Sequence, residues 1–366
     1  MPDITKIADI VRATLPTIEM GKWDSVGLAQ LYPEYEYVKQ WITGAKHKKG
    51  SSYEIQTELE IQSPSSFEAS FPNHAAKTSV PKQVKDIKSR MVKARTKATF
   101  SEDEKALQGG SAQKILDVVE MRMKKLHRDM IEGLEHAFLG FPATPDEFPQ
   151  VLKGVLGYWN APNSGVTDFA LNGGLDPVGH PLGAGEITVA AEPRWANAVA
   201  KFAKISDDDF FDQLERFINQ VRMLAVIPHP EVAPNVPRRV IYVQEPVKRA
   251  VSRYFTAGND DVGHDAGVYR DANMFKSTPI TIWHAMSSVD SPVRPTNCVV
   301  QLIDWNAFQY SVLEGFDQKI TGPTMLPEVP GQMVVYNELW HNLHCTRRDR
   351  LMFMTSDNPD LQPDAS

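Results

Sequence analysis

The clearest periodic pattern in the chain lies in residues 112–138, where apolar residues recur every three or four positions. At 100° per residue these positions fall within one arc of roughly 100°, the stripe expected of an amphipathic helix. The stripe consists of Ile115, Leu116, Val119, Met123, Leu126, Met130 and Leu134. The charged residues outside the arc include Lys124, Lys125, Arg128, Glu132 and Glu135. With Ser111 as an N-cap and Gly140 as a stop, the pattern predicts one helix about 40 Å long.

A period of two appears before this helix. Residues 53–61 alternate apolar with polar positions, as a half-buried strand does, and a Ser/Pro-rich stretch then interrupts them. Residues 84–100 return with strand-like and basic character, so 53–100 predict a long two-stranded excursion. A two-stranded ribbon is marginally stable in water by itself. We therefore expect it to lie on another surface, and a neighbouring subunit is the natural candidate.

The second half of the chain mixes both periods. Residues 206–225 predict a helix whose buried face includes Phe210, Leu214 and Phe217, and Pro246–Phe255 predict a shorter one. Cys298–Ile303 is almost continuously apolar, which is typical of a strand buried on both faces. The remaining expected strands are Val240–Val243, Phe275–Lys276, Ile280–Trp283, Val334–Thr346 and Leu351–Met354. The fold class is therefore α+β, and residues 141–190, rich in Pro, Gly and Asn, are expected to be irregular.

Composition and charge limit the classes of protein to which the chain can belong. Apolar residues make up 42% and charged residues 23% of the 366 positions, and no apolar run reaches the length of a membrane span. We expect a cytoplasmic origin without a signal peptide, and two buried thiols at Cys298 and Cys345. Residues 77–97 hold eight cations and one acid, a charge of +7, so the rest of the chain carries −14. Such a basic strip fits docking on a neighbouring copy, contact with nucleic acid, or a solvated loop.

The sequence gives little evidence for residues that catalyse a reaction or bind a metal ion. His341, His344 and Cys345 cluster in sequence, but on a strand 344 points away from 341 and 345, so they cannot converge on one ion. The acids and histidine of the Gly-rich loop at 256–271 match no calcium-loop spacing. No nucleophile elbow, zinc-protease helix or phosphate-binding glycine loop is present. We expect no catalytic residues, no cofactor and no metal.

The order of these elements resembles the major capsid proteins of tailed bacteriophages, the Hong Kong 97-type capsid fold. The resemblance continues through Tyr269–Asp271, Phe275–Trp283, Cys298–Trp305 and Leu343–Arg350. It implies five parts along the chain. These are an extended N-terminal arm (1–52), an E-loop β-hairpin (53–105), the long spine helix with the first part of a peripheral domain (106–190), an axial domain (191–330), and a return strand to the peripheral domain with a C-terminal tail (331–366).

The resemblance also implies a function. Such proteins self-assemble as pentamers and hexamers into an icosahedral shell that encloses double-stranded DNA, with scaffold, portal and decoration proteins as partners and no membrane. The shell forms in the host bacterial cytoplasm and becomes the virion capsid. Basic residues are then candidates for inter-subunit contacts: Lys82, Lys85, Lys88, Arg90, Lys93, Arg347, Arg348 and Arg350.

Two alternatives stay open. One is an encapsulin-type nanocompartment, which has the same fold and a protein cargo. The other is a metal-dependent hydrolase that uses His229, His264, Asp265 and His341.

Overall fold

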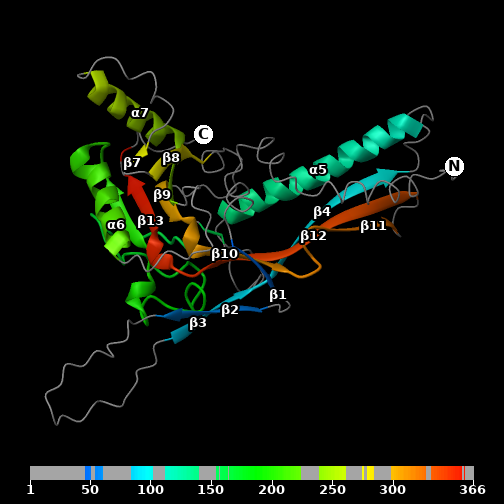
Figure 1. Ribbon diagram of the computed structural model, residues 1–366, viewed down its shortest axis with the longest axis horizontal. Helices are drawn as coiled ribbons and strands as arrows, with labels where there is room; N and C mark the ends of the chain where they lie inside the picture. The colour runs from blue at the N-terminus through cyan, green and yellow to red at the C-terminus, as the bar shows by residue number, and fades with distance from the viewer. Residues whose placement is uncertain are drawn as a thin grey trace, which may run out of the picture.

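A computed structural model of the chain is shown in Figure 1. It describes residues 46–50, 54–60, 84–101, 112–139, 154–155, 157–163, 165–223, 239–260, 274–275, 278–283, 298–326, 331–356 and 358. Ser111 and Gly140, expected to cap the long helix, lie outside these residues. No helix among the described residues is long and apolar enough to cross a membrane.

The five-stranded sheet is built around one long strand. β12 (Gln332–Cys345) pairs antiparallel with β4 (Val92–Ser101), β10 (Phe308–Leu313) and β11 (Lys319–Met325), and β1 (Lys46–Gly50) adds to β10 in parallel. The 14 residues of β12 therefore hold together strands from three distant parts of the chain.

The predicted long helix is confirmed as α5 (Ala112–Leu139), which lies along this sheet in Figure 1. The first half of its stripe packs on the sheet, where Val119, Met123 and Leu126 meet Phe100 of β4. The second half enters a larger core at Met130 and Leu134.

One charged position of α5 departs from the expectation of a solvent-facing polar side. Glu135 is buried rather than exposed. The reason is a hydrogen bond, since the Trp283 indole Nε1–H donates to Glu135 Oε1 at 2.6 Å. His127 is half-buried, and its ring Nδ1 lies 3.4 Å from Asn337 Nδ2 of β12.

The six-stranded sheet runs in the order β5 (Ala198–Phe202), β13 (Leu351–Ser356), β9 (Cys298–Asp304), β6 (Arg239–Val243), β8 (Thr278–Ile282) and β7 (Met274–Phe275). The prediction of a strand buried on both faces at 298–303 is confirmed where side chains are described, because Val300, Gln301, Leu302 and Ile303 are all buried.

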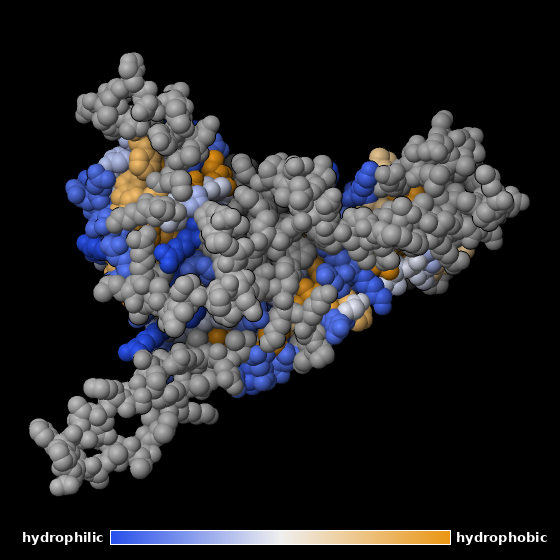
Figure 2. Space-filling model, in the orientation of Figure 1, coloured by the Kyte–Doolittle hydropathy of each residue, from blue (hydrophilic) through white to orange (hydrophobic). Residues whose placement is uncertain are grey.

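Two helices accompany this sheet. A π-helical turn, Asp207–Phe211, leads into α6 (Asp212–Met223), and α7 (Glu245–Asp260) follows β6. The predicted face of Phe210, Leu214 and Phe217 is buried in their shared core. Figure 2 shows a hydrophilic outer surface over α6 and a small apolar area where α6 and α7 meet.

The predicted two-stranded excursion is confirmed for residues 54–60 and 84–90, whereas residues 92–101, expected to belong to it, form a strand of the five-stranded sheet. β2 (Glu54–Glu60) and β3 (Val84–Arg90) form an antiparallel pair separate from both sheets, and the pair lies along the lower edge of the body in Figure 1. Its base is anchored by Ile55 and Ile87, both buried. After Met91 the chain switches to β4 and joins the five-stranded sheet.

The two sheets are connected by two chain crossings that lie side by side, which we call the joint. One runs from β9 through Trp305–Ala307 to β10, and the other from β12 through Arg348–Arg350 to β13. Thr346 N–H and its hydroxyl both donate to Ala307 O, at 2.7 and 3.0 Å. The crossings change the predicted boundary at residue 330, because β10 and β11 belong with β12 while β13 joins the other sheet.

The segment expected to be irregular, 141–190, has few regular elements where it is described, but much of it is core. Tyr158, Trp159 and Asn160 are buried, as are Trp195 and Asn197 a little further on. Asn160 Nδ2 donates to Met352 O of β13 at 3.0 Å, and Asn197 Nδ2 donates to Asn160 Oδ1 at 2.9 Å. Buried amides thus take over the hydrogen bonding that a regular element would supply.

Candidate inter-subunit surface

β4 places the side chains at the end of the basic strip (residues 77–97) alternately on the two faces of the five-stranded sheet. Successive side chains of a strand point to opposite sides. Ala98 and Phe100 pack in the core under α5, and the Thr96 hydroxyl donates to Leu126 O at 3.2 Å. Lys93, Arg95 and Lys97 are exposed and therefore lie on the face turned away from α5. Together with Tyr336, Glu338 and Trp340 of β12 they form the basic sheet face.

A single carboxylate organises this face. Glu338 Oε1 pairs with Lys93 Nζ at 3.0 Å and with the Arg95 guanidinium. Lys93 Nζ also lies 5.6 Å from the centroid of the Trp340 ring, and Arg95 lies 4.6 Å from that of Tyr336. The aromatic rings and the acid hold the cations over the sheet.

Glu338 is ionised as a result of these contacts. Burial acts to raise its pKa, but hydrogen bonds from Lys93 and Arg95, together with their charges, outweigh burial and hold the pKa below the ordinary 4.5. Since the folded pKa is the lower one, this interaction stabilises the fold above pH 4.5 and is lost as the pH falls below that value.

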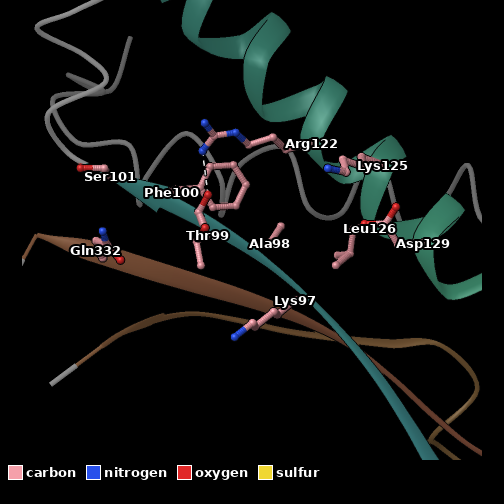
Figure 3. A pocket seen from close by; sticks show the side chains of 10 residues that line it. All are labelled: Lys97, Ala98, Thr99, Phe100, Ser101, Arg122, Lys125, Leu126, Asp129 and Gln332. Atoms are coloured by element: carbon pink, nitrogen blue, oxygen red, sulfur yellow. Dashed lines mark hydrogen bonds between the residues drawn. The ribbon is translucent and has the colours of Figure 1, made fainter. Parts of the chain in front are cut away.

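A cleft of about 280 Å³ opens between α5 and the end of β4 (Figure 3). Arg122 crosses it, donating from Nη1 to Thr99 O at 2.6 Å and lying 5.4 Å from the Phe100 ring centroid. Lys125 and Asp129 line the helix side, while the Lys97 side chain points away from the helix. Arg122 therefore ties the helix to the sheet across the cleft.

The predicted contact residues of the hairpin are placed as follows. Lys82 lies outside the described residues, and Lys85 is described by its backbone in β3. Lys88 Nζ is 3.8 Å from Glu186 Oε2, and its backbone N–H donates to Gly185 O at 3.1 Å. Arg90 is exposed at the end of β3. Of the predicted contact residues in and beside the hairpin, Arg90 and Lys93 have described side chains that are exposed.

The prediction for Arg348 is wrong, because this side chain is fully buried at the joint. Its Nε donates to Trp159 O at 2.7 Å, and its Nη2 donates to Leu175 O at 2.6 Å and to Asn197 Oδ1 at 3.1 Å. Burial lowers the pKa of Arg348 to about 10, so the group is still cationic at neutral pH. A guanidinium enclosed by carbonyls of its own chain has nothing left to present to another subunit.

The two arginines beside it also bind within the chain. Arg347 donates two hydrogen bonds to the Asp349 carboxylate, at 2.9 and 2.7 Å. Arg350 Nη1 lies 3.2 Å from Oδ2 of the buried Asp304, which also pairs with Arg239 at 3.7 Å. The Arg347 side chain is 31% exposed and the Arg350 side chain is 15% exposed. Both therefore make their ion pairs within the joint and present little surface to a neighbour.

His341, His344 and Cys345 all lie on β12 and are buried, with the divergence expected of a strand. The His341 ring stacks near Tyr310 at 5.4 Å, whereas His344 Nδ1 lies 3.2 Å from Ser89 Oγ on the opposite face. Burial raises the pKa of the Cys345 thiol. No group of three or more metal-ligating side chains occurs among the described residues; His229, His264 and Asp265 are not among them.

His341 makes folding sensitive to acid. Burial lowers its pKa from 6.5 to about 3, so below pH 6.5 the unfolded chain binds a proton that the folded chain does not. We expect the free energy of unfolding to fall by about 2 kcal/mol between pH 7 and pH 5 from this group, measured by urea denaturation. The His341→Phe variant should lose correspondingly less over the same interval. Identical losses in both proteins would contradict this assignment.

Tyr336 and Trp340 are functional candidates that sequence reasoning missed. The basic strip has no aromatic residues of its own, and these two come from a strand about 240 positions later. The register that places Trp340 opposite Lys93 and Tyr336 opposite Lys97 supplies them. The sequence predicted a strand at Val334–Thr346, but it did not indicate which strand pairs with it.

Comparison with known proteins gives matches by structure. No protein-family model and no curated protein sequence matches the chain. The capsid asymmetric unit of cyanophage A-1(L) matches with a TM-score of 0.58 at 10% identity, covering 87% of this chain and 92% of that one. The capsid of a native GTA particle matches with a TM-score of 0.50 at 11% sequence identity. The match covers 85% of this chain and 88% of that one. The capsid of cyanophage P-SCSP1u matches with a TM-score of 0.50 at 10% sequence identity. The match covers 87% of this chain and 88% of that one. The chain therefore has the α+β fold of phage capsid proteins.

Proposed function

We propose that this chain is a major capsid protein, which assembles as pentamers and hexamers into an icosahedral shell around double-stranded phage DNA. The observation that carries the proposal is the β2–β3 pair, which joins neither sheet of a body that has the capsid fold. A two-stranded ribbon needs a surface to lie on, and sister subunits supply one.

In this proposal the elements take the roles that the resemblance implies. Residues 1–52 are the N-terminal arm, the β2–β3 pair belongs to the E-loop, and α5 is the spine helix. The five-stranded sheet under α5 is the peripheral platform, and the six-stranded sheet with α6 and α7 is the axial domain. The return from β12 to β13 through the joint makes the two domains one folding unit.

The basic sheet face and the exposed hairpin cations are the proposed contacts with neighbours. The acidic remainder of the chain offers complementary charge, and exposed ion pairs are each worth only about 0–1 kcal/mol. Closed symmetry repeats such contacts around a ring and adds them up. A net negative body also limits sticking to packaged DNA, which then makes non-specific contact with the shell.

The remaining expectations follow from a shell role. The proposed partners are other copies of the chain, with scaffold, portal and decoration proteins joining the particle. Assembly takes place in the cytoplasm of a bacterial host, and the product is the virion capsid. Structural neighbours of this kind are not enzymes, and we assign no catalytic residue.

Electron microscopy of the overexpressed protein tests the proposal. The expected result is closed shells with pentameric and hexameric units. Particles that protect double-stranded DNA from nuclease support the phage shell, whereas closed shells that enclose protein and no DNA support the encapsulin-type alternative. Irregular aggregates or no particles at all would contradict both.

Deleting residues 63–82, between the two hairpin strands, should leave a soluble subunit that forms no stable shells. The reason is that the hairpin's partners lie on other chains, while its base at Ile55 and Ile87 stays anchored in the core. Sedimentation and far-UV circular dichroism measure the two outcomes separately. A deletion variant that forms normal shells would show that the hairpin does not hold subunits together.

A further inference from the structure

Large apolar side chains that face solvent are concentrated in one short loop. Of the five among the described residues, three lie within residues 175–182, which we call the apolar loop. Leu175 is 51% exposed, Val178 86% and Leu182 64%. Scattered single apolar residues are normal on a protein surface, but a group of three in eight residues is not explained by folding of the subunit.

The apolar loop is held in place by buried groups. Arg348 Nη2 donates to Leu175 O at 2.6 Å, and Val189 N–H donates to Asp176 Oδ1 at 2.9 Å. His180 N–H donates to Pro177 O at 3.1 Å, and the His180 ring lies edge-on to Tyr158 with centroids 4.9 Å apart. A loop fixed in this way loses little conformational freedom when it docks.

The composition of the loop is that of an interface core. Residues 175–185 contain no Lys, Arg or Glu, and the one acid, Asp176, accepts a hydrogen bond within the loop region. Depletion of charge with retention of large apolar side chains distinguishes the centre of protein–protein contacts from the rest of a surface.

The apolar loop also adjoins the hairpin. Gly185, three residues after Leu182, accepts a hydrogen bond from Lys88 N–H of β3 at 3.1 Å, and Glu186 pairs with Lys88 Nζ at 3.8 Å. The segment that directly follows the apolar loop therefore contacts the base of the hairpin.

We propose that the apolar loop docks on a second copy of this chain within the assembled shell. Three side chains cover on the order of 300 Å², well under the roughly 800 Å² per partner of a stable pairwise complex. A contact this small holds only where closed symmetry repeats it, which a shell provides and a free binding partner does not. The proposal thus rests on the proposed function and adds a contact at the foot of the hairpin.

The test is assembly of the Val178→Asp/Leu182→Asp double variant. We expect the yield of shells to fall at least about tenfold, because a charge in a desolvated contact weakens every copy of it. The thermal unfolding midpoint of the free subunit should stay at the parent value, since both side chains already face solvent. Asn172→Asp adds one negative charge, against two in the double variant, at an exposed polar position before the loop, and it should assemble like the parent.

A second measurement covers the case in which the double variant fails to fold. The thiol of the V178C variant should react with a maleimide in free subunits and be protected in shells, while that of N172C stays reactive in both. Parent protein treated in parallel supplies the background of the native cysteines. A parent that forms no shells overturns the proposed function and this contact together. Shells from the double variant at parent yield, or an unprotected V178C thiol in shells, overturn the contact alone.

Discussion

Replacing Arg348 with Met should lower the free energy of unfolding by about 3 kcal/mol, a large share of the 5–15 kcal/mol that stabilises a typical domain. Trp159 O, Leu175 O and Asn197 Oδ1 would each lose a buried donor. An unsatisfied buried polar group costs about 1–3 kcal/mol, and removal of the buried cation offsets part of the sum. Urea denaturation of the free subunit measures the difference.

Arg347→Met is the matched control. Arg347 is adjacent in sequence, but its side chain is 31% exposed and bonds to Asp349 two residues away. Exposed or local ion pairs contribute about 0–1 kcal/mol, so this variant should stay close to the parent. Equal losses in the two variants would show that Arg348 does not hold the joint.

Leu126→Asp should abolish folding of the subunit itself. Leu126 is 1% exposed and packs with Phe100, Val119 and Met333 between α5 and the sheet. An uncompensated carboxylate there costs well over 4 kcal/mol, comparable with the stability of the whole fold. The expected result is insoluble protein, or soluble protein without a cooperative unfolding transition.

Met121→Asp provides the comparison on the same helix. Met121 is 63% exposed, and a surface substitution of this kind changes stability by about 0.5 kcal/mol or less. The Met121→Asp subunit should therefore remain folded by circular dichroism. A well-folded Leu126→Asp subunit would mean that the predicted stripe does not face the core.

Much of the local structure could be predicted from the sequence because its cause is local. The stripe at 112–138 predicts α5 to within one residue at its end, since helical periodicity is written in neighbouring turns. The apolar run at 298–303 predicts β9, and the alternation at 53–61 predicts β2. The order of these elements was enough to indicate the capsid fold.

The joint and the basic sheet face could not be predicted, because both depend on pairing between distant segments. The run Arg347–Arg350 has the composition of a surface, yet the turn between β12 and β13 carries Arg348 into the core. Glu135 is charged and outside the apolar arc, but Trp283, 148 residues later, supplies a buried donor. Trp340 meets Lys93 only once the register of β12 and β4 is known.

The predicted division at residue 330 does not coincide with the division between the two sheets, for the same reason. A sequence boundary assumes that each domain is one continuous stretch, whereas the chain crosses between the two sheets twice at the joint. The sequence of β13 is apolar like that of β12, so composition does not reveal that consecutive strands belong to different sheets. The hydrogen bonds between strands show which sheet each strand belongs to.

Sedimentation velocity of the purified full-length chain, over a range of concentration, salt and added scaffold protein, tests the central claim most directly. The claim is that a lone subunit leaves the hairpin and its foot uncovered and that sister copies cover them. We predict conversion of slowly sedimenting subunits or small rings into one population of very large, closed particles. A compact monomer that sediments as a single species under every condition would contradict the capsid assignment.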